Sequence, residues 1–103
     1  MNESFKKDEI RERVLKIFNI FNGLKKLLSE RYRCTENLIE IHDPPHIIRI
    51  LKSEELIIFY QLDEEIAVLG RNEIKIKKGF EDYVRKWLIA LTSFEFKRYI
   101  IKK

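Results

Sequence analysis

A run of apolar residues near the N-terminus recurs in alternating steps of four and three. Its members are Ile10, Val14, Ile17, Phe21, Leu24 and Leu28. Because an α-helix completes one turn every 3.6 residues, this spacing keeps one apolar stripe facing the same way. Leu15, Phe18, Ile20 and Leu27 widen the stripe beyond a coiled-coil seam. The pattern therefore predicts a long helix that lies on a globular core.

The pair Asn22-Gly23 interrupts this stretch, and a glycine inside a helix costs about 1 kcal/mol relative to alanine. The apolar phase nevertheless continues across the pair without a slip. We therefore predict one helix that is bent there and ends near Tyr32 or Arg33. Two shorter helices are the alternative.

A second copy of the rhythm closes the chain. It runs through Phe80, Val84, Trp87, Leu91 and Phe94, and then Arg98 and Ile101. This predicts a helix over residues 80–92. Residues 94–103 either continue as helix, because the rhythm persists, or form a last strand, because Phe94 and Phe96 alternate with Glu95 and Lys97. We favour the helix.

The middle of the chain is rich in β-branched residues and is divided by short turns. The predicted strands cover residues 37–42, 46–52, 56–62, 66–69 and 74–78. Turns this short allow only antiparallel neighbours. We predict an α+β fold with a long N-terminal helix, an antiparallel β-meander of four to five strands and a C-terminal helix. Lysines alternate with isoleucines in the last strand, which indicates a sheet edge.

The strands at 46–52 and 56–62 are apolar on both faces, so each face of the sheet needs cover. Either each face receives one helix, or both helices lie on one face and the chain ends or a second subunit cover the other. Two apolar helical stripes and a two-sided apolar sheet exceed what a small monomer easily buries. We therefore expect a homodimer, for which two-fold symmetry is the commonest arrangement.

The composition limits the class of protein. A chain of 103 residues, 45% apolar, is expected to fold as one α+β domain over residues 1–103. The chain is 37% charged. Its abundance of Ile, Lys and Glu suggests a thermophilic or a viral source.

Cys34 is the only cysteine, which excludes an intrachain disulfide and a cysteine metal cluster. We therefore expect an intracellular, cytoplasmic protein. The charged N-terminus lacks an apolar signal core, and the longest apolar run, residues 56–60, is too short to cross a bilayer. No membrane partner is expected.

The charge is distributed unevenly. Residues 1–33 carry a net charge of +4, residues 34–65 carry −6 and residues 66–103 carry +6. Cations of the last segment lie on the predicted hairpin and on the helix that follows, at Arg71, Lys75, Lys77, Lys78, Arg85 and Lys86. Rows of cations contact phosphates, and Tyr83 adds a ring for stacking on unpaired bases. These residues predict a nucleic-acid surface, although the same lysines also protect a sheet edge.

A metal-dependent nuclease site is a second alternative. Asp63 is followed ten residues later by Glu73-Ile74-Lys75. An acid, then Glu-x-Lys on a strand, then a helix is similar to the order in restriction-endonuclease-like nucleases. That resemblance implies that Asp63 and Glu73 hold a divalent cation and that Lys75 assists an attacking water, with Glu30 as a further acid.

The segment from His42 to His46 suggests a transition-metal site at one turn. His42, Asp43 and His46 supply suitable ligand types, and in a meander the 63–65 turn lies at the same end of the sheet. An ordinary acidic turn with two partly exposed histidines is the competing interpretation.

The order of helix, meander and helix is similar to that of several small dimeric modules, including the Alu-RNA-binding proteins of the signal recognition particle. This is a likeness of architecture, which does not imply function. We expect a non-enzymatic homodimeric module without a cofactor that binds nucleic acid. The alternatives are a protein–protein interaction factor, such as a viral or plasmid-encoded inhibitor of a host protein, and the nuclease.

Overall fold

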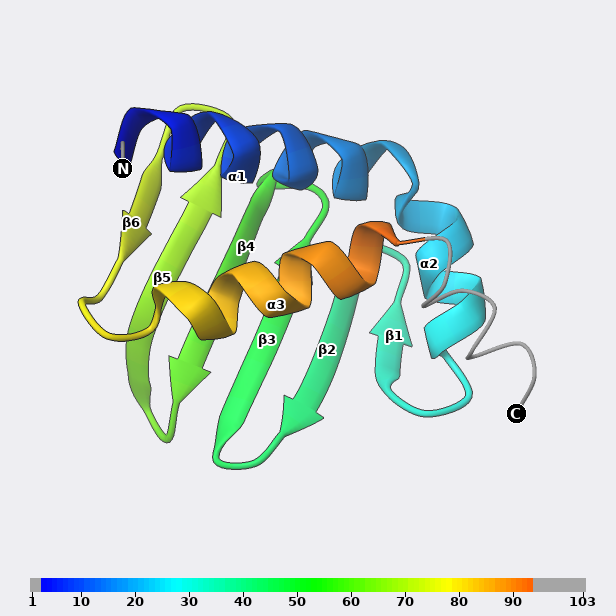
Figure 1. The fold of residues 1–103 in the computed structure, drawn as a ribbon. Coiled ribbons are helices and arrows are strands. Elements are labelled where there is room, and N and C mark those ends of the chain that lie inside the picture. The colour runs from blue at the N-terminus through cyan, green and yellow to red at the C-terminus, as the bar shows by residue number, and fades with distance from the viewer. Residues whose placement is uncertain (1–2, 94–103) are drawn as a thin grey trace.

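The computed structural model describes residues 3–93. Within this range the chain has an α+β fold with three helices and six strands (Figure 1). The helices are α1 (Glu3–Asn19), α2 (Phe21–Leu28) and α3 (Glu81–Thr92). The strands are β1 (Arg33–Thr35), β2 (Leu38–Asp43), β3 (His46–Leu51), β4 (Leu56–Gln61), β5 (Glu64–Gly70) and β6 (Ile74–Ile76). The predicted order of N-terminal helical region, meander and C-terminal helix is confirmed.

The N-terminal apolar stripe forms two helices rather than one bent helix. The break lies at Ile20, where φ is −104° and ψ is 18°, so it precedes the expected Asn22-Gly23 pair. The second helix ends at Leu28, and the chain then turns, with the Tyr32 N–H donating to the Leu28 carbonyl. The expected end near Tyr32 or Arg33 is therefore wrong, because Arg33 already begins β1.

The sheet is an antiparallel meander in which the six strands lie in chain order. All five predicted strands are present within one to two residues of their expected bounds. The sheet also has a sixth strand that was not predicted. This strand, β1, pairs with β2 and places Cys34 opposite Ile39. The predicted edge strand, β6, is the last strand of the sheet and carries Lys75.

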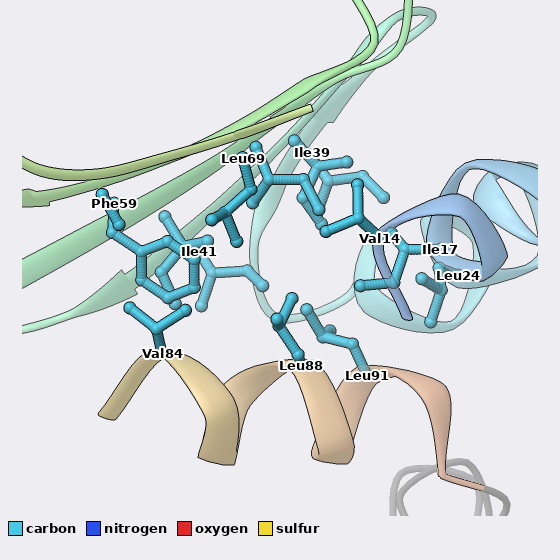
Figure 2. Close-up of a cluster of buried hydrophobic side chains, with 14 of the residues drawn as sticks. Val14, Ile17, Leu24, Ile39, Ile41, Phe59, Leu69, Val84, Leu88 and Leu91 are labelled. Carbon is cyan, nitrogen blue, oxygen red and sulfur yellow. The ribbon is translucent and has the colours of Figure 1, made fainter. Parts of the chain in front are cut away.

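Both long helices lie on the same face of the sheet (Figure 1). In Figure 2, side chains of α1 and α3 point toward the same sheet residues, Ile39, Ile41, Phe59 and Leu69. The helical members labelled there are Val14, Ile17, Leu24, Val84, Leu88 and Leu91, and all are nearly or fully buried. The alternative with one helix on each face is therefore wrong. The described residues form two layers around one core.

Polar contacts also join the two long helices along their shared edge. The Arg85 Nη2 atom of α3 donates to both carboxylate oxygens of Glu9 in α1, at 3.1 Å each. Arg13 of α1 donates to the hydroxyl of Thr92, at the end of α3. The turn into α3 uses Gly79, whose φ of +96° suits glycine and whose N–H donates to Glu81.

The question of helix or strand for residues 94–103 lies outside the described residues.

Candidate functional site

The sheet face turned away from the helices is not covered by any helix that the structure describes. Strand alternation and register place apolar and polar residues of all six strands on this open face. The apolar members are Leu38, Ile47, Leu51, Leu56, Ile58, Tyr60 and Val68. The polar members are Glu40, His42 and Arg49 on the central strands, with Arg33, Thr35, Glu65 and Lys75 nearer the edges. None of these residues belongs to the helix-covered core. The open face is therefore an aliphatic surface with a small polar centre and further charged residues toward its edges.

An ion pair forms that polar centre. The Arg49 Nε atom donates to Glu40 Oε2 at 2.7 Å, and His42 Nε2 lies 3.4 Å from Glu40 Oε1. The guanidinium group of Arg49 also lies over the Tyr60 ring, 5.2 Å from its centroid. Glu40 is only 7% exposed although it lies on the open face. The hydrogen bond from Arg49 lowers the pKa of the Glu40 carboxyl below its usual value, so this nearly buried group stays charged near neutral pH.

Sequence reasoning did not single out Glu40 and Arg49. A signal was present, since each is a charged residue inside a strand whose neighbours are mostly isoleucine and leucine. The strand register explains why the two charges occur there, because Glu40 is the direct cross-strand partner of Arg49.

Four of the six cations predicted to bind nucleic acid are paired with carboxylates of the same chain. These pairs are Arg71 with Glu55 (3.3 Å), Lys75 with Glu73 (3.5 Å), Lys77 with Glu64, and Arg85 with Glu9 (3.1 Å). For Lys78 and Lys86 we find no ion pair within residues 3–93. Exposed ion pairs contribute little free energy, so phosphates can compete for these cations. Nucleic-acid binding by this surface stays a prediction.

The ring expected to accompany these cations is turned inward. The Tyr83 hydroxyl donates to Asp43 Oδ2 at 2.6 Å, and the His46 ring lies 4.2 Å from the Tyr83 ring. Burial, together with the hydrogen bond to Asp43, raises the pKa of Tyr83 above its ordinary value. Tyr83 is therefore part of a packed cluster rather than a free stacking surface.

A groove of about 660 Å³ lies where the start of α1, β6 and the start of α3 meet. Its apolar floor comes from Ile10, Ile74 and Ile76. Its rim carries both signs of charge, from Lys7, Lys75, Glu81, Asp82 and Arg85. The predicted cations Lys75 and Arg85 thus border a groove of mixed rather than uniformly positive charge.

The residues of the nuclease alternative do not meet in the structure. Asp63 lies in the turn before β5, whereas Glu73 lies beyond the far end of β5. A strand of this length separates its ends by about 20 Å, too far for two carboxylates to share a cation. Among residues 3–93, Lys75 forms an ion pair with Glu73, at 3.5 Å.

The three residues of the metal alternative are also separated. Strand alternation places His42 on the open face, whereas Asp43 and His46 lie on the helix side of the sheet. The two turns do lie together as expected, because the Leu62 N–H donates to the Pro45 carbonyl at 3.0 Å. Within residues 3–93, however, there is no group of three or more metal-ligating side chains placed to hold an ion.

Asp43 instead joins the β2–β3 turn to α3. Its Oδ2 atom accepts hydrogen bonds from Tyr83 and from Trp87 Nε1, the second at 3.2 Å. Trp87 was expected to be core, and it does pack against the core while its N–H reaches Asp43.

No helix among the described residues has the length and apolar character required to cross a membrane.

Comparison with known proteins places the chain in a family. The sequence model of that family, described as "Archaeoglobi AF1636 family protein", matches residues 3–103. The chain belongs to the Archaeoglobi AF1636 family. This match spans both long helices and the whole sheet, so the family is defined over the same residues that form the helix–meander–helix fold.

A relative of this AF1636 family member is an uncharacterised protein of Archaeoglobus fulgidus. The two are 31% identical over 88 residues, which are 85% of this chain and 94% of the relative. That thermophilic archaeal source agrees with the Ile-, Lys- and Glu-rich composition. No solved structure matches the chain. Neither description names an activity or a ligand, so the functional argument depends on geometry.

Proposed function

We propose that this protein is a non-enzymatic protein-interaction module whose open face is its docking surface. One observation carries the proposal: α1 and α3 cover the same face of the sheet, and seven apolar side chains lie on the other, six of them partly exposed and Ile58 9% exposed. Contiguous apolar surfaces of this kind mark interaction sites in soluble domains.

The chemistry of the open face favours a protein over a nucleic acid. Six of its seven apolar members are aliphatic, and its aromatic rings within the described residues are those of Tyr60 and His42. Sheet surfaces that bind single strands use several aromatic rings for base stacking. Aliphatic side chains instead gain free energy by packing against other aliphatic side chains.

Nucleic-acid binding through the basic hairpin and α3 is the second candidate. The absence of an ionic partner for Lys78 and Lys86 among the described residues favours it. The two candidates use different surfaces and respond differently to salt, because phosphate contacts weaken steeply with ionic strength and apolar contacts do not.

Retention on an immobilised copy of the chain tests the docking surface. Untagged copies of the chain and an archaeal cell extract are passed over the column at low and at high salt. We expect a protein to be retained at both salt concentrations and to be lost with Leu51→Lys or Ile47→Lys on the column. Lys86→Glu, a charge change on α3, is the matched control and should retain it. Retention that survives both open-face variants, or no retention at all, would contradict the proposal.

Fluorescence anisotropy with single- and double-stranded oligonucleotides tests the second candidate, with magnesium or with EDTA. Binding that falls with salt and is reduced in Lys78→Glu and Lys86→Glu, but not in Leu51→Lys, would support it. A denaturing gel of the same samples reveals any magnesium-dependent cleavage. Absence of oligonucleotide binding at low salt would exclude nucleic-acid binding as the function.

A further inference from the structure

Five cations lie at the end of the molecule where α2 lies beside β1 (Figure 1). We define this α2–β1 surface by Lys25, Lys26, Arg31, Arg33 and Lys52. None of the five forms an ion pair with a carboxylate of residues 3–93. The basic hairpin and α3 differ, because four of their six cations are paired.

Tertiary contacts bring Lys52 of the β3–β4 turn to α2. The Nζ atoms of Lys25 and Lys52 lie over the Phe21 ring, 5.9 and 5.6 Å from its centroid. The Lys52 N–H donates to the Asn37 carbonyl at 2.9 Å, and Lys25 Nζ donates to the Glu36 carbonyl at 3.4 Å. Both acceptors lie in the β1–β2 turn, so cations that are far apart in the sequence meet around this turn.

A hollow of about 530 Å³ lies between α2 and β1, among these cations. Six residues that line it are polar or small: Asn22, Lys25, Lys26, Ser29, Cys34 and Thr35. The side chains of Asn22 and Thr35 form no hydrogen bond with residues 3–93, so both can donate to a ligand. No large apolar side chain of the described residues lines the hollow, whereas protein interfaces have an apolar centre. The hollow therefore suits a polar anion.

Carboxylates at this surface are fewer than cations. Three carboxylates without an ion pair to residues 3–93 lie in the same segments, at Glu30, Glu36 and Glu54. Glu40 lies beside Arg33 in the strand register, but it is already bonded to Arg49. The hairpin and α3 instead face as many carboxylates as they have cations, at Glu9, Glu55, Glu64, Glu73, Glu81 and Asp82. The positive excess therefore lies at the α2–β1 surface.

Lys25 and Lys26 also lie in the last turn of α2, where cations stabilise the negative end of a helix. That role does not extend to Arg31, Arg33 and Lys52, which lie outside α2. The eight residues of α2 span about 12 Å. A nucleic-acid duplex carries about seven phosphate charges over that length, so cations along α2 and β1 can meet several phosphates.

We propose that the α2–β1 surface binds the phosphates of a nucleic acid, through its five cations and through Asn22 and Thr35. Phosphate oxygens accept hydrogen bonds from lysine, arginine and neutral side chains, and such contacts position a nucleic acid without reading its sequence. The proposal does not rest on docking by the apolar residues of the open face. It also uses a different surface from the basic hairpin and α3.

Fluorescence anisotropy of a labelled duplex, titrated with the pure full chain in EDTA, tests this surface. With four or five phosphate contacts, the association constant should fall by roughly 150- to 500-fold between about 50 and about 200 mM salt. A wild type that does not bind at about 50 mM salt would overturn the proposal.

Two neutralising substitutions locate the contacts. Lys26→Gln and Arg33→Gln should each weaken binding by about three- to tenfold and make the salt dependence shallower by about one phosphate contact. Both side chains are exposed, so the circular dichroism spectrum and thermal midpoint should not change. Lys78→Gln and Lys86→Gln are the matched controls and should bind like the wild type. Binding reduced by the controls, and not by Lys26→Gln and Arg33→Gln, would overturn the assignment.

Glu36→Gln separates phosphate binding from a structural role of the cations. Glu36 lines the hollow, and its backbone carbonyl still accepts from Lys25 after the substitution. Binding should tighten by about threefold, because the repulsion between this carboxylate and a phosphate is removed. Unchanged or weaker binding would contradict a phosphate site in the hollow.

Competition with polyglutamate separates a nucleic acid from an acidic protein. An unlabelled duplex should displace the labelled one at least about tenfold better than polyglutamate of the same total charge, because the duplex releases more condensed counterions. Equal competition would show that the surface accepts acidic proteins as well, and would overturn a nucleic acid as its ligand.

Discussion

At the level of single residues, Asp43 joins parts of the molecule that are far apart in sequence. Its Oδ2 atom accepts from Tyr83 and Trp87, which lie 40 and 44 residues further along the chain. Tyr83 and Trp87 are four residues apart, so a helix must present them on one face. The shared acceptor follows from the tertiary structure alone, because nothing in the segment 42–46 indicates a contact with α3.

Tyr83→Phe should lower the free energy of unfolding by about 1 kcal/mol near neutral pH, since one hydrogen bond to Asp43 is lost. The pKa of Tyr83 is raised from 10.0 in the folded state, so this contribution is complete below that pH and is lost as the pH rises above it. Urea denaturation of both proteins, repeated between about pH 7 and about pH 11, measures the difference.

The phenolate absorbance of the folded protein provides a check on the same residue. Tyr83 should not ionise at alkaline pH until the chain unfolds. The titration is compared between the folded wild type and Tyr83→Phe. If the wild type gains the absorbance of one additional tyrosine that ionises at its ordinary pKa, then burial and Asp43 do not suppress the ionisation of Tyr83.

At the level of elements, the N-terminal helices show what a periodic pattern can and cannot predict. The four-and-three rhythm identified the apolar stripe, and Val14, Ile17, Phe21 and Leu24 are buried as it requires. The rhythm continues across Ile20 because both helices contact the same core, so it contains no signal for the break. Gly23, which looked like the breaker, lies inside α2.

Gly23→Ala should therefore stabilise the protein by about 0.5–1 kcal/mol and raise the thermal midpoint by a few degrees, because alanine is the better helix former. A Cβ atom at Gly23 would meet no atom within 4 Å. Thermal denaturation followed by circular dichroism measures the shift.

Gly79→Ala is the matched control for this prediction. A Cβ atom there also has open space, but φ is +96°, so we expect destabilisation by backbone strain. If both substitutions change stability in the same direction, the helical assignment of Gly23 is wrong.

At the level of the whole molecule, one core joins all the layers. Leu88 of α3 is fully buried and packs with residues of α1, α2 and the sheet, whereas its neighbour Ile89 is 37% exposed. Leu88→Ala should lower the free energy of unfolding by about 2–5 kcal/mol. Ile89→Ala should change it by about 0.5 kcal/mol or less. Urea denaturation of the two variants at one protein concentration tests this, and similar losses for both would contradict the common core.

The candidate surfaces could be predicted only in part. The cations of the β5–β6 hairpin and of α3 were visible in the sequence, and β6 is an edge strand as expected. Their partners were not visible, because Glu9, Glu55 and Glu64 lie between 13 and 76 residues away in the chain. A cation's availability for a phosphate depends on such contacts, which sequence spacing does not encode.

The sequence by itself determined the N-terminal and C-terminal helical regions, five of the six strands and their antiparallel order, because periodicity and short turns act between residues that are close in the chain. It also indicated that the sheet is apolar on both faces. Only the tertiary structure decided that α1 and α3 pack on the same face, and hence that Leu51, Ile58 and the Glu40–Arg49 pair lie on the other. The physical reason is that adjacent isoleucines in β3 and β4 make the two faces almost equal in hydrophobicity, so the choice depends on packing between the two ends of the chain.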